Sequence, residues 1–190
     1  MDADGLTFCC AMGVEERIAK RLGRTARVGL GASNGVPPAG RLVSFGIAGA
    51  LAPDLAVGTL IDATRVVDET GTTLWEGPPL GVSPAQTGTI LGASRIVDDP
   101  AERAALHRAS GADAVDMESG PLARSGRLAG CIRAISDTPD CGLAGLAEGV
   151  TLAGDPNPLG LLRGFVRAPV ATARAAANSW RALRRLEALA

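Results

Sequence analysis

Short apolar segments alternate along the chain with segments in which apolar residues recur every three or four positions. The short apolar segments predict seven buried strands, at residues 5–11, 26–30, 41–47, 59–67, 89–97, 112–117 and 131–135. Helical spacing follows the first strand, where Val14, Ile18 and Leu22 share one face and charged residues occupy the others. Strands that alternate with helices are typical of α/β proteins, so we expect an α/β fold.

A second helix is marked by its own end signals. Asp99 is suited to the N-cap, Pro100 to the first helical position and Glu102 to the third, so a helix begins there and runs to about Ser110. Gly111 is suited to its C-terminus. A proline-containing helix is predicted near residues 121–128.

The C-terminal part of the chain is glycine-rich from residue 140 to about 160, and Pro169 separates two predicted helices. The last, arginine-rich helix covers about 170–189. One predicted stripe on it is apolar and consists of Ala173, Ala177, Trp180, Leu183 and Leu186. The opposite stripe consists of Arg174, Asn178, Arg181 and Arg185. The pattern favours a helix packed on the domain with its basic face in water, and contact with an anionic membrane surface is the alternative.

Composition narrows the class of protein. A chain of 190 residues, 46 % hydrophobic and 21 % charged, predicts a single globular domain over 1–190. The net charge of −1 gives no general attraction to nucleic acid, although residues 161–190 contain six arginines and one glutamate. No apolar stretch reaches the roughly 18 residues of a transmembrane helix, and the acidic start Met1-Asp2-Ala3-Asp4 does not resemble a signal peptide. We therefore expect a cytoplasmic protein, with the basic helix as a candidate membrane contact.

Several residue types that often carry chemistry are interpreted here as structural. Cys9, Cys10, Cys131 and Cys141 lack metal-ligand spacing, and with a single histidine no metal site is expected. His107 is predicted to be a surface or helix-end residue. The glycine-rich segment 29–35 is followed by Val36-Pro37-Pro38 instead of the helix that a dinucleotide-binding loop requires.

Carboxylates follow three of the predicted strands. Glu15 comes after the first strand, Glu118 after 112–117 and Asp137 after 131–135. Strand ends are where open α/β sheets bind ligands, so these side chains are expected to lie at one site. An acid and a carboxylate are also what glycosidic bond cleavage needs: the acid protonates the leaving group, and the carboxylate activates water.

Three segments resemble a known family in order and chemistry: 44–50 (SFGIAGA), 114–119 (AVDMES) and 135–137 (ISD). They resemble the nucleoside phosphorylase/nucleosidase superfamily, whose members cut the N-glycosidic bond of nucleosides, and most closely its hopanoid-associated branch. Residues 48–60 are also similar to the family's segment leading into the next strand. The resemblance implies a three-layer phosphorylase/hydrolase-like fold, with a central mixed twisted sheet flanked by helices. It also implies a homodimer.

The resemblance assigns roles to individual residues. Ser136 and Asp137 match the pair that carries the general acid, and burial after a strand would favour the protonated form of Asp137. Glu15 matches the glutamate that binds water. Met117 would lie against the ribose, and Glu118 would accept hydrogen bonds from its 2′ and 3′ hydroxyls. Backbone groups would line the site at Gly46, Ile47, Ala48 and Gly49, in the turn expected after strand 41–47.

The implied reaction is hydrolytic release of adenine from a purine nucleoside, with adenosylhopane as the specific candidate and no metal or organic cofactor. Phosphate-using relatives have an arginine and a small hydroxyl residue where this chain has Ser44 and Ile47, which favours water over phosphate as acceptor. Arg17 leaves a phosphorolytic alternative open, with phosphate as co-substrate. Because segments 15–46 and 71–88 are short for the family, a non-catalytic nucleoside-binding member is the third interpretation. Trp75 and Phe45 are the candidates for base stacking.

Overall fold

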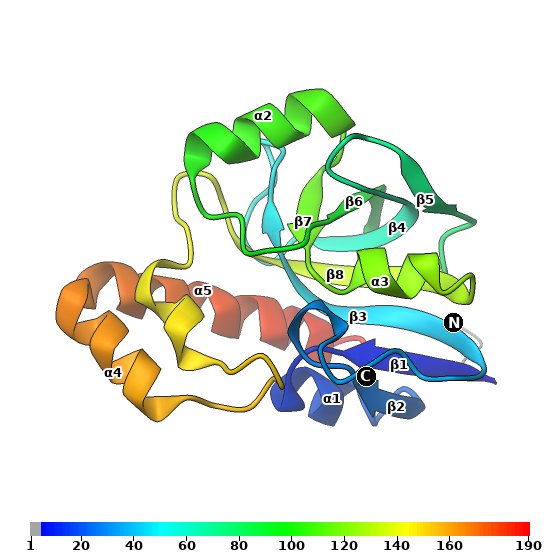
Figure 1. Cartoon of the computed structure of the whole chain (residues 1–190), viewed down its shortest axis with the longest axis horizontal. Helices are drawn as coiled ribbons and strands as arrows, with labels where there is room; N and C mark the ends of the chain where they lie inside the picture. Colours follow the sequence, from blue (N-terminus) through cyan, green and yellow to red (C-terminus); the bar gives the residue numbers. More distant parts are fainter. Residues whose placement is uncertain (1–4) are drawn as a thin grey trace.

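The computed structural model describes residues 5–190 (Figure 1), so the expectation about Met1–Asp4 lies outside the described residues. It contains one eight-stranded sheet. The strands are β1 (Leu6–Cys10), β2 (Arg24–Arg27), β3 (Arg41–Ala50), β4 (Leu60–Val67), β5 (Thr73–Glu76), β6 (Gln86–Gly92), β7 (Ala114–Asp116) and β8 (Leu128–Asp137). The helices are α1 (Gly13–Ala19), α2 (Pro100–Ser110), α3 (Ser119–Arg124), α4 (Pro158–Arg167) and α5 (Pro169–Glu187), with 3₁₀ turns η1 (Leu30–Ala32) and η2 (Ala144–Gly149).

The sheet is mixed and closes on itself. Its order is β2-β1-β3-β7-β6-β4-β5, and β8 pairs with both β3 and β4, so that β3, β8, β4, β6 and β7 form a ring. β1, β3 and β8 run parallel to one another, and β7 runs antiparallel to β3. Figure 1 shows α2 on one side of the molecule and α1, α4 and α5 on the other. The predicted mixed α/β fold, a central sheet flanked by helices, is confirmed.

Apolar strand residues form the core on both faces of the sheet. One cluster contains Phe8, Phe45 and Ile132 together with Ala182 and Leu186 of α5. Phe8 and Phe45 meet edge to face, with ring centroids 5.8 Å apart. Phe45 is fully buried in this contact, so it is a core residue and is not available to stack on a base. Trp75 packs against the core cluster on the other face.

Two strands extend further than the sequence pattern predicted. β3 continues to Ala50, so the segment expected as a turn at 46–49 is extended strand. The physical reason is β8, which pairs with β3 from Leu42 to Gly49 and satisfies its backbone groups despite the glycines. β8 begins at Leu128, earlier than predicted, so the proline-containing helix α3 stops at Arg124. Asp137 is the last residue of β8.

Other boundaries shift where glycines change the backbone direction. The predicted strand 26–30 is instead β2 at Arg24–Arg27 followed by η1, with Gly29 and Gly31 at positive φ. The strand predicted at 89–97 is β6 at Gln86–Gly92. Helix α2 was predicted correctly: the Asp99 carboxylate accepts a hydrogen bond from the Glu102 amide at 2.8 Å, and Gly111 is left-handed.

The C-terminal helices confirm the break at Pro169. The predicted apolar stripe of α5 is only partly correct: Leu186 is buried and Leu183 is half-buried, whereas Ala173 and Ala177 are exposed. The buried face consists of Thr172, Ala175, Asn178, Ala182 and Leu186, and Trp180 is 62 % exposed. Small side chains allow α5 to approach the sheet closely, and Asn178 is satisfied there by contact with the Cys141 sulfur at 3.4 Å. Among residues 5–190, no helix is long and apolar enough to cross a membrane.

Candidate active site

A cavity of about 280 Å³ lies where β1, β3, β7 and β8 end. Eight of the nine predicted site residues line it: Glu15, Ile47, Ala48, Gly49, Met117, Glu118, Ser136 and Asp137. They come from four separate parts of the chain. The tertiary structure therefore brings together the groups that the sequence resemblance selected.

Glu15 is held at the start of α1 and points toward β3. Its two carboxylate oxygens accept hydrogen bonds from the backbone amides of Met12 and Ile47, both at 2.9 Å. Burial raises the pKa of Glu15 above its ordinary value, and the Arg133 charge and these amides oppose that effect. The carboxylate is thus fixed in position beside the backbone of 46–47.

Gly46 supports Glu15 but does not line the cavity, which corrects the sequence assignment. A Cβ atom on Gly46 would lie 2.3 Å from Glu15 Oε1 and 2.6 Å from Arg133 Nη1. The missing side chain therefore lets a carboxylate and a guanidinium both approach the strand backbone. Gly49 has a similar relation to Asp137, whose Oδ2 would lie 2.7 Å from its Cβ.

Arg133 is a fully buried cation behind the cavity wall. It forms an ion pair with Asp116, lies 3.7 Å from Glu118 Oε2 and donates to the Ser44 hydroxyl. Its Nε and Nη1 atoms have no hydrogen-bond partner among residues 5–190. Arg133 does not line the cavity, so it acts on the site by neutralising the carboxylates that surround it.

Glu118 and Met117 lie at the exit of β7. Glu118 Oε1 accepts a hydrogen bond from the Gly31 amide at 3.0 Å. Burial, together with the negative charge of Asp116, raises the pKa of Glu118 to about 8. Met117 is half-buried and lines the cavity, where it provides an apolar surface.

Asp137 is paired with an arginine that sequence reasoning missed. The buried Arg103 guanidinium donates to Asp137 Oδ2, and the Ser136 hydroxyl lies 2.7 Å from Oδ1. These two contacts fix the position of the Asp137 carboxyl group at the cavity. Arg103 occupies an ordinary helical position, and no motif marks it in the sequence.

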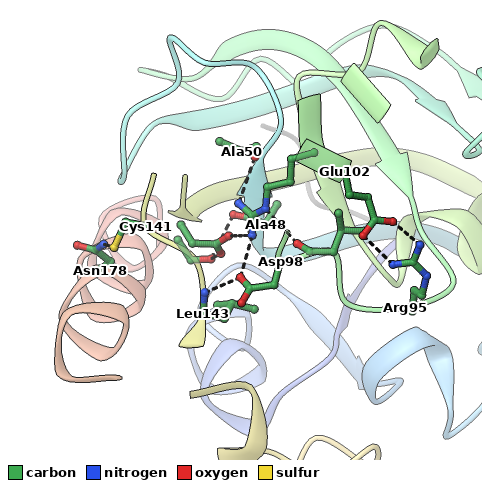
Figure 2. Close-up of polar contacts among 12 residues, drawn as sticks. Ala48, Ala50, Arg95, Asp98, Glu102, Cys141, Leu143 and Asn178 are labelled. Carbon is green, nitrogen blue, oxygen red and sulfur yellow. Dashed lines mark hydrogen bonds and ion pairs between the residues drawn. The ribbon is translucent and has the colours of Figure 1, made fainter. Parts of the chain in front are cut away.

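Arg103 is itself held rigidly from several sides. It donates to the backbone oxygens of Val97 at 3.0 Å and Ala50 at 3.2 Å, and it lies 3.5 Å from Asp98. Figure 2 shows Ala50, Asp98 and Leu143 around this group. Asp98 also accepts the Leu143 amide at 2.8 Å, which ties the segment before α2 to the segment that enters η2.

Neither Ser44, which replaces the arginine of phosphate-using relatives, nor Arg17, the candidate phosphate contact, lines the cavity. The Ser44 hydroxyl is buried and contacts Arg133 and Ser119, and Ser44 does not line the cavity. Arg17 is exposed on α1 and is also absent from the cavity wall. The arginines in that wall are Arg95 and Arg103, and each already pairs with a carboxylate.

Most of the remaining cavity wall is apolar and comes from the segments around α1, η1 and η2, from the segment before α2 and from α5. Its members are Val14, Leu30, Ile96, Leu143, Leu146, Val150 and Leu183. Within residues 5–190, no cluster of three or more metal-ligating side chains occurs. The cavity therefore combines a group of carboxylates and arginines with an apolar wall.

Comparison with known proteins places this geometry in context. The family model described as Phosphorylase superfamily matches residues 79–152, which include β7, Met117, Glu118 and Asp137. No curated protein matches the sequence significantly. Solved structures with the same fold include the 5′-methylthioadenosine/S-adenosylhomocysteine nucleosidase of Helicobacter pylori. It is 15 % identical with a TM-score of 0.56, over 97 % of this chain and 96 % of that one.

Two further solved structures have the same fold. The futalosine hydrolase of Helicobacter pylori is 15 % identical with a TM-score of 0.56, over 97 % of this chain and 96 % of that one. The 5′-methylthioadenosine/S-adenosylhomocysteine nucleosidase of Neisseria meningitidis is 16 % identical with a TM-score of 0.55, over 95 % and 97 %. The chain has the nucleosidase fold. The segment matched by the family model supplies Met117 and Glu118, which follow β7, and Ser136 and Asp137, which end β8.

Proposed function

We propose that this protein is a purine nucleosidase of the phosphorylase superfamily, which hydrolyses the N-glycosidic bond of an adenine nucleoside. The observation that supports this most strongly is the meeting of Glu15, Glu118 and Asp137 around one cavity. These three carboxylates provide the acid, the water-binding group and the ribose-binding group that the reaction needs.

In the proposed reaction, a water oxygen forms a bond to C1′ while the bond from C1′ to the base nitrogen breaks. The electron pair of that bond goes to the base, which takes a proton from Asp137 and leaves as adenine. The water gives up a proton to Glu15, which the backbone amides of Met12 and Ile47 hold in position. Water and two carboxyl groups balance the reaction, so no metal or organic cofactor is required.

The ribose is proposed to bind at Met117 and Glu118. A carboxylate can accept hydrogen bonds from two neighbouring hydroxyl groups at once. Glu118 does so in its ionised form, whereas its raised pKa favours the neutral form in the unliganded protein. Met117 would cover the apolar face of the sugar.

The substrate is proposed to carry an apolar 5′ group. The apolar wall of the cavity supports this, because such a wall favours hydrocarbon over charged or hydrogen-bonding groups. A structural neighbour from Helicobacter pylori holds 5′-methylthioadenosine in its active site. Adenosylhopane, whose 5′ group is a large hydrocarbon, remains the specific candidate from the sequence resemblance.

The test is adenine release from adenosylhopane, 5′-methylthioadenosine and adenosine, measured with and without phosphate for the wild type and Asp137→Asn. We expect phosphate-independent release that falls by at least about 100-fold in the variant. Release only with phosphate would establish phosphorolysis instead. Tight binding of these nucleosides by folded protein without release would identify a non-catalytic binding protein.

Homodimerisation is also proposed, on the sequence resemblance. Light scattering on the purified full chain would measure the mass directly. A monomeric mass at micromolar protein concentration would contradict the proposed homodimer.

A further inference from the structure

Helix α4 and the first turn of α5, which contains Val170, present large apolar side chains to solvent. Leu159, Leu162, Val166 and Val170 are 61–81 % exposed, and Phe165 is 37 % exposed. These five residues, which we call the α4 surface, are five of the eight large hydrophobic residues found exposed within residues 5–190. Such a concentration in one segment marks an interaction site, whereas single exposed apolar residues are common.

The opposite face of α4 is fixed to the protein by glycines. A Cβ on Gly145 would lie 2.2 Å from the Gly164 Cα, and a Cβ on Gly160 would lie 1.9 Å from the Glu148 oxygen. Thr172 also donates to the Gly164 oxygen at 3.1 Å. Because the glycine face is packed this closely on η2, α4 cannot rotate to bury its leucines. The α4 surface therefore faces outward as part of the fold.

Basic side chains outnumber acidic ones around this surface. From residue 156 to residue 186 the sequence contains six arginines and no aspartate or glutamate. Arg163 follows Leu162 directly and is one helical turn from Leu159 and Val166, so it shares their face. Arg163 and Arg174 are exposed, while Arg167 pairs with Glu148 at 2.7 Å.

We propose that the α4 surface docks on an anionic lipid bilayer. An amphipathic helix with exposed leucine, valine and phenylalanine between arginines buries its apolar face at the headgroup boundary and attracts anionic lipid. The sequence pattern had placed a candidate membrane contact on the basic face of α5. The structure moves it to α4, because that is where arginine and large apolar side chains coincide on one exposed face.

The position of α4 also links docking to substrate access, a link that rests on the proposed function. The turn η2 lies between α4 and the cavity: Gly145 and Gly149 contact α4, while Leu146 and Ala147 line the cavity. A docked α4 would bring the apolar part of the cavity wall close to the membrane. A nucleoside with a lipid at its 5′ carbon would then have a short path from the bilayer to the site.

The test is flotation of the full chain with vesicles of phosphatidylglycerol and phosphatidylcholine, and with vesicles of phosphatidylcholine alone. We expect binding to the anionic vesicles that weakens with salt. Leu162→Ser with Val166→Ser should reduce it by about tenfold or more, and Arg163→Glu by roughly fivefold or more. Leu152→Ser and Arg41→Glu are matched controls, since Leu152 is 69 % exposed and Arg41 is also exposed, and both lie outside the α4 surface.

Three results would overturn the proposal. The first is a wild type without affinity for anionic vesicles, and the second is a loss of binding in the controls as large as in the α4 variants. A third is a dimer that the Leu162→Ser, Val166→Ser variant converts to a monomer without any vesicle binding, which would make the surface a contact between copies. Adenine release from soluble 5′-methylthioadenosine should be unchanged in this variant. Failure of docking is thereby separated from failure of the nucleosidase assignment.

Discussion

Arg103 and Asp137 form a buried ion pair between the first turn of α2 and the last residue of β8. Their side chains are 1 % and 2 % exposed, and they are 34 residues apart in the sequence. The backbone oxygens of Val97 and Ala50 hold the guanidinium in place. In the proposed reaction, Arg103 therefore acts through Asp137 as a positioning residue that holds the acid in place.

Arg103→Met is expected to lower kcat more than it changes KM. The guanidinium holds the Asp137 carboxyl group in place, and a misplaced acid slows the chemical step without removing a contact to the ribose. The measurement is adenine release as a function of substrate concentration. Arg95→Met is the matched control, because Arg95 lines the same cavity but pairs with Glu102. An unchanged kcat in Arg103→Met, or an equal loss of kcat in the control, would refute this role.

The same ion pair is expected to dominate local stability. Removing one partner leaves an uncompensated buried charge, so Arg103→Met should lower the free energy of unfolding by about 3–5 kcal/mol. Combining it with Asp137→Asn should cost less than the sum of the two single changes. Urea unfolding of the four proteins measures this coupling. Simple additivity would mean that the two side chains do not interact energetically.

Gly46→Ala is expected to disturb Glu15 and Arg133 directly. The new methyl group would overlap Glu15 Oε1 and Arg133 Nη1, so roughly 1–3 kcal/mol of stability should be lost together with most of the activity. Gly130→Ala is a matched control in the neighbouring strand, because its Cβ meets the end of the Leu80 side chain. The control should lower the melting temperature but leave kcat/KM of the folded protein nearly unchanged. Equal activity losses in both variants would count against a specific role for Gly46.

Glu118 is expected to make stability depend on pH. Its pKa in the folded protein is raised to about 8 from an ordinary value of 4.5, so between these values the folded state binds more protons than the unfolded state. Its contribution to stability is present below the lower value and is lost as pH rises toward 8. Glu118→Gln should remove this contribution, giving a flatter dependence of the unfolding free energy between pH 5 and 8. A profile identical to that of the wild type would contradict the assignment.

The same titration predicts how nucleoside affinity changes with pH. Only the ionised Glu118 accepts hydrogen bonds from both ribose hydroxyls, so the affinity of Asp137→Asn for 5′-methylthioadenosine should rise as pH increases toward 8. Calorimetry on this slow variant avoids turnover during the measurement. In Asp137→Asn with Glu118→Gln, affinity should be weak at every pH. A pH-dependent rise that survives in the double variant would assign the effect to another group.

Local signals in the sequence determined much of the framework. Asp99, Pro100 and Gly111 act within one or two turns of the chain, so the position of α2 was predicted correctly. Strand–helix alternation predicted the mixed α/β class, and carboxylates after strands marked Glu15, Glu118 and Asp137. Such features depend on neighbouring residues and on periodicity, which a single sequence contains.

Contacts between distant segments were decided only by the tertiary structure. β8 keeps β3 extended through Gly46 and Gly49, and close packing against the sheet selects the small-residue face of α5 over the stripe containing Trp180. The partners of Arg103 and Arg133 come from other elements, so the charge balance at Asp137 and the unpartnered N–H groups beside Glu15 are visible only after folding. The pairing and burial of these charged side chains depend on distances in space, which the spacing of residues along the chain does not give.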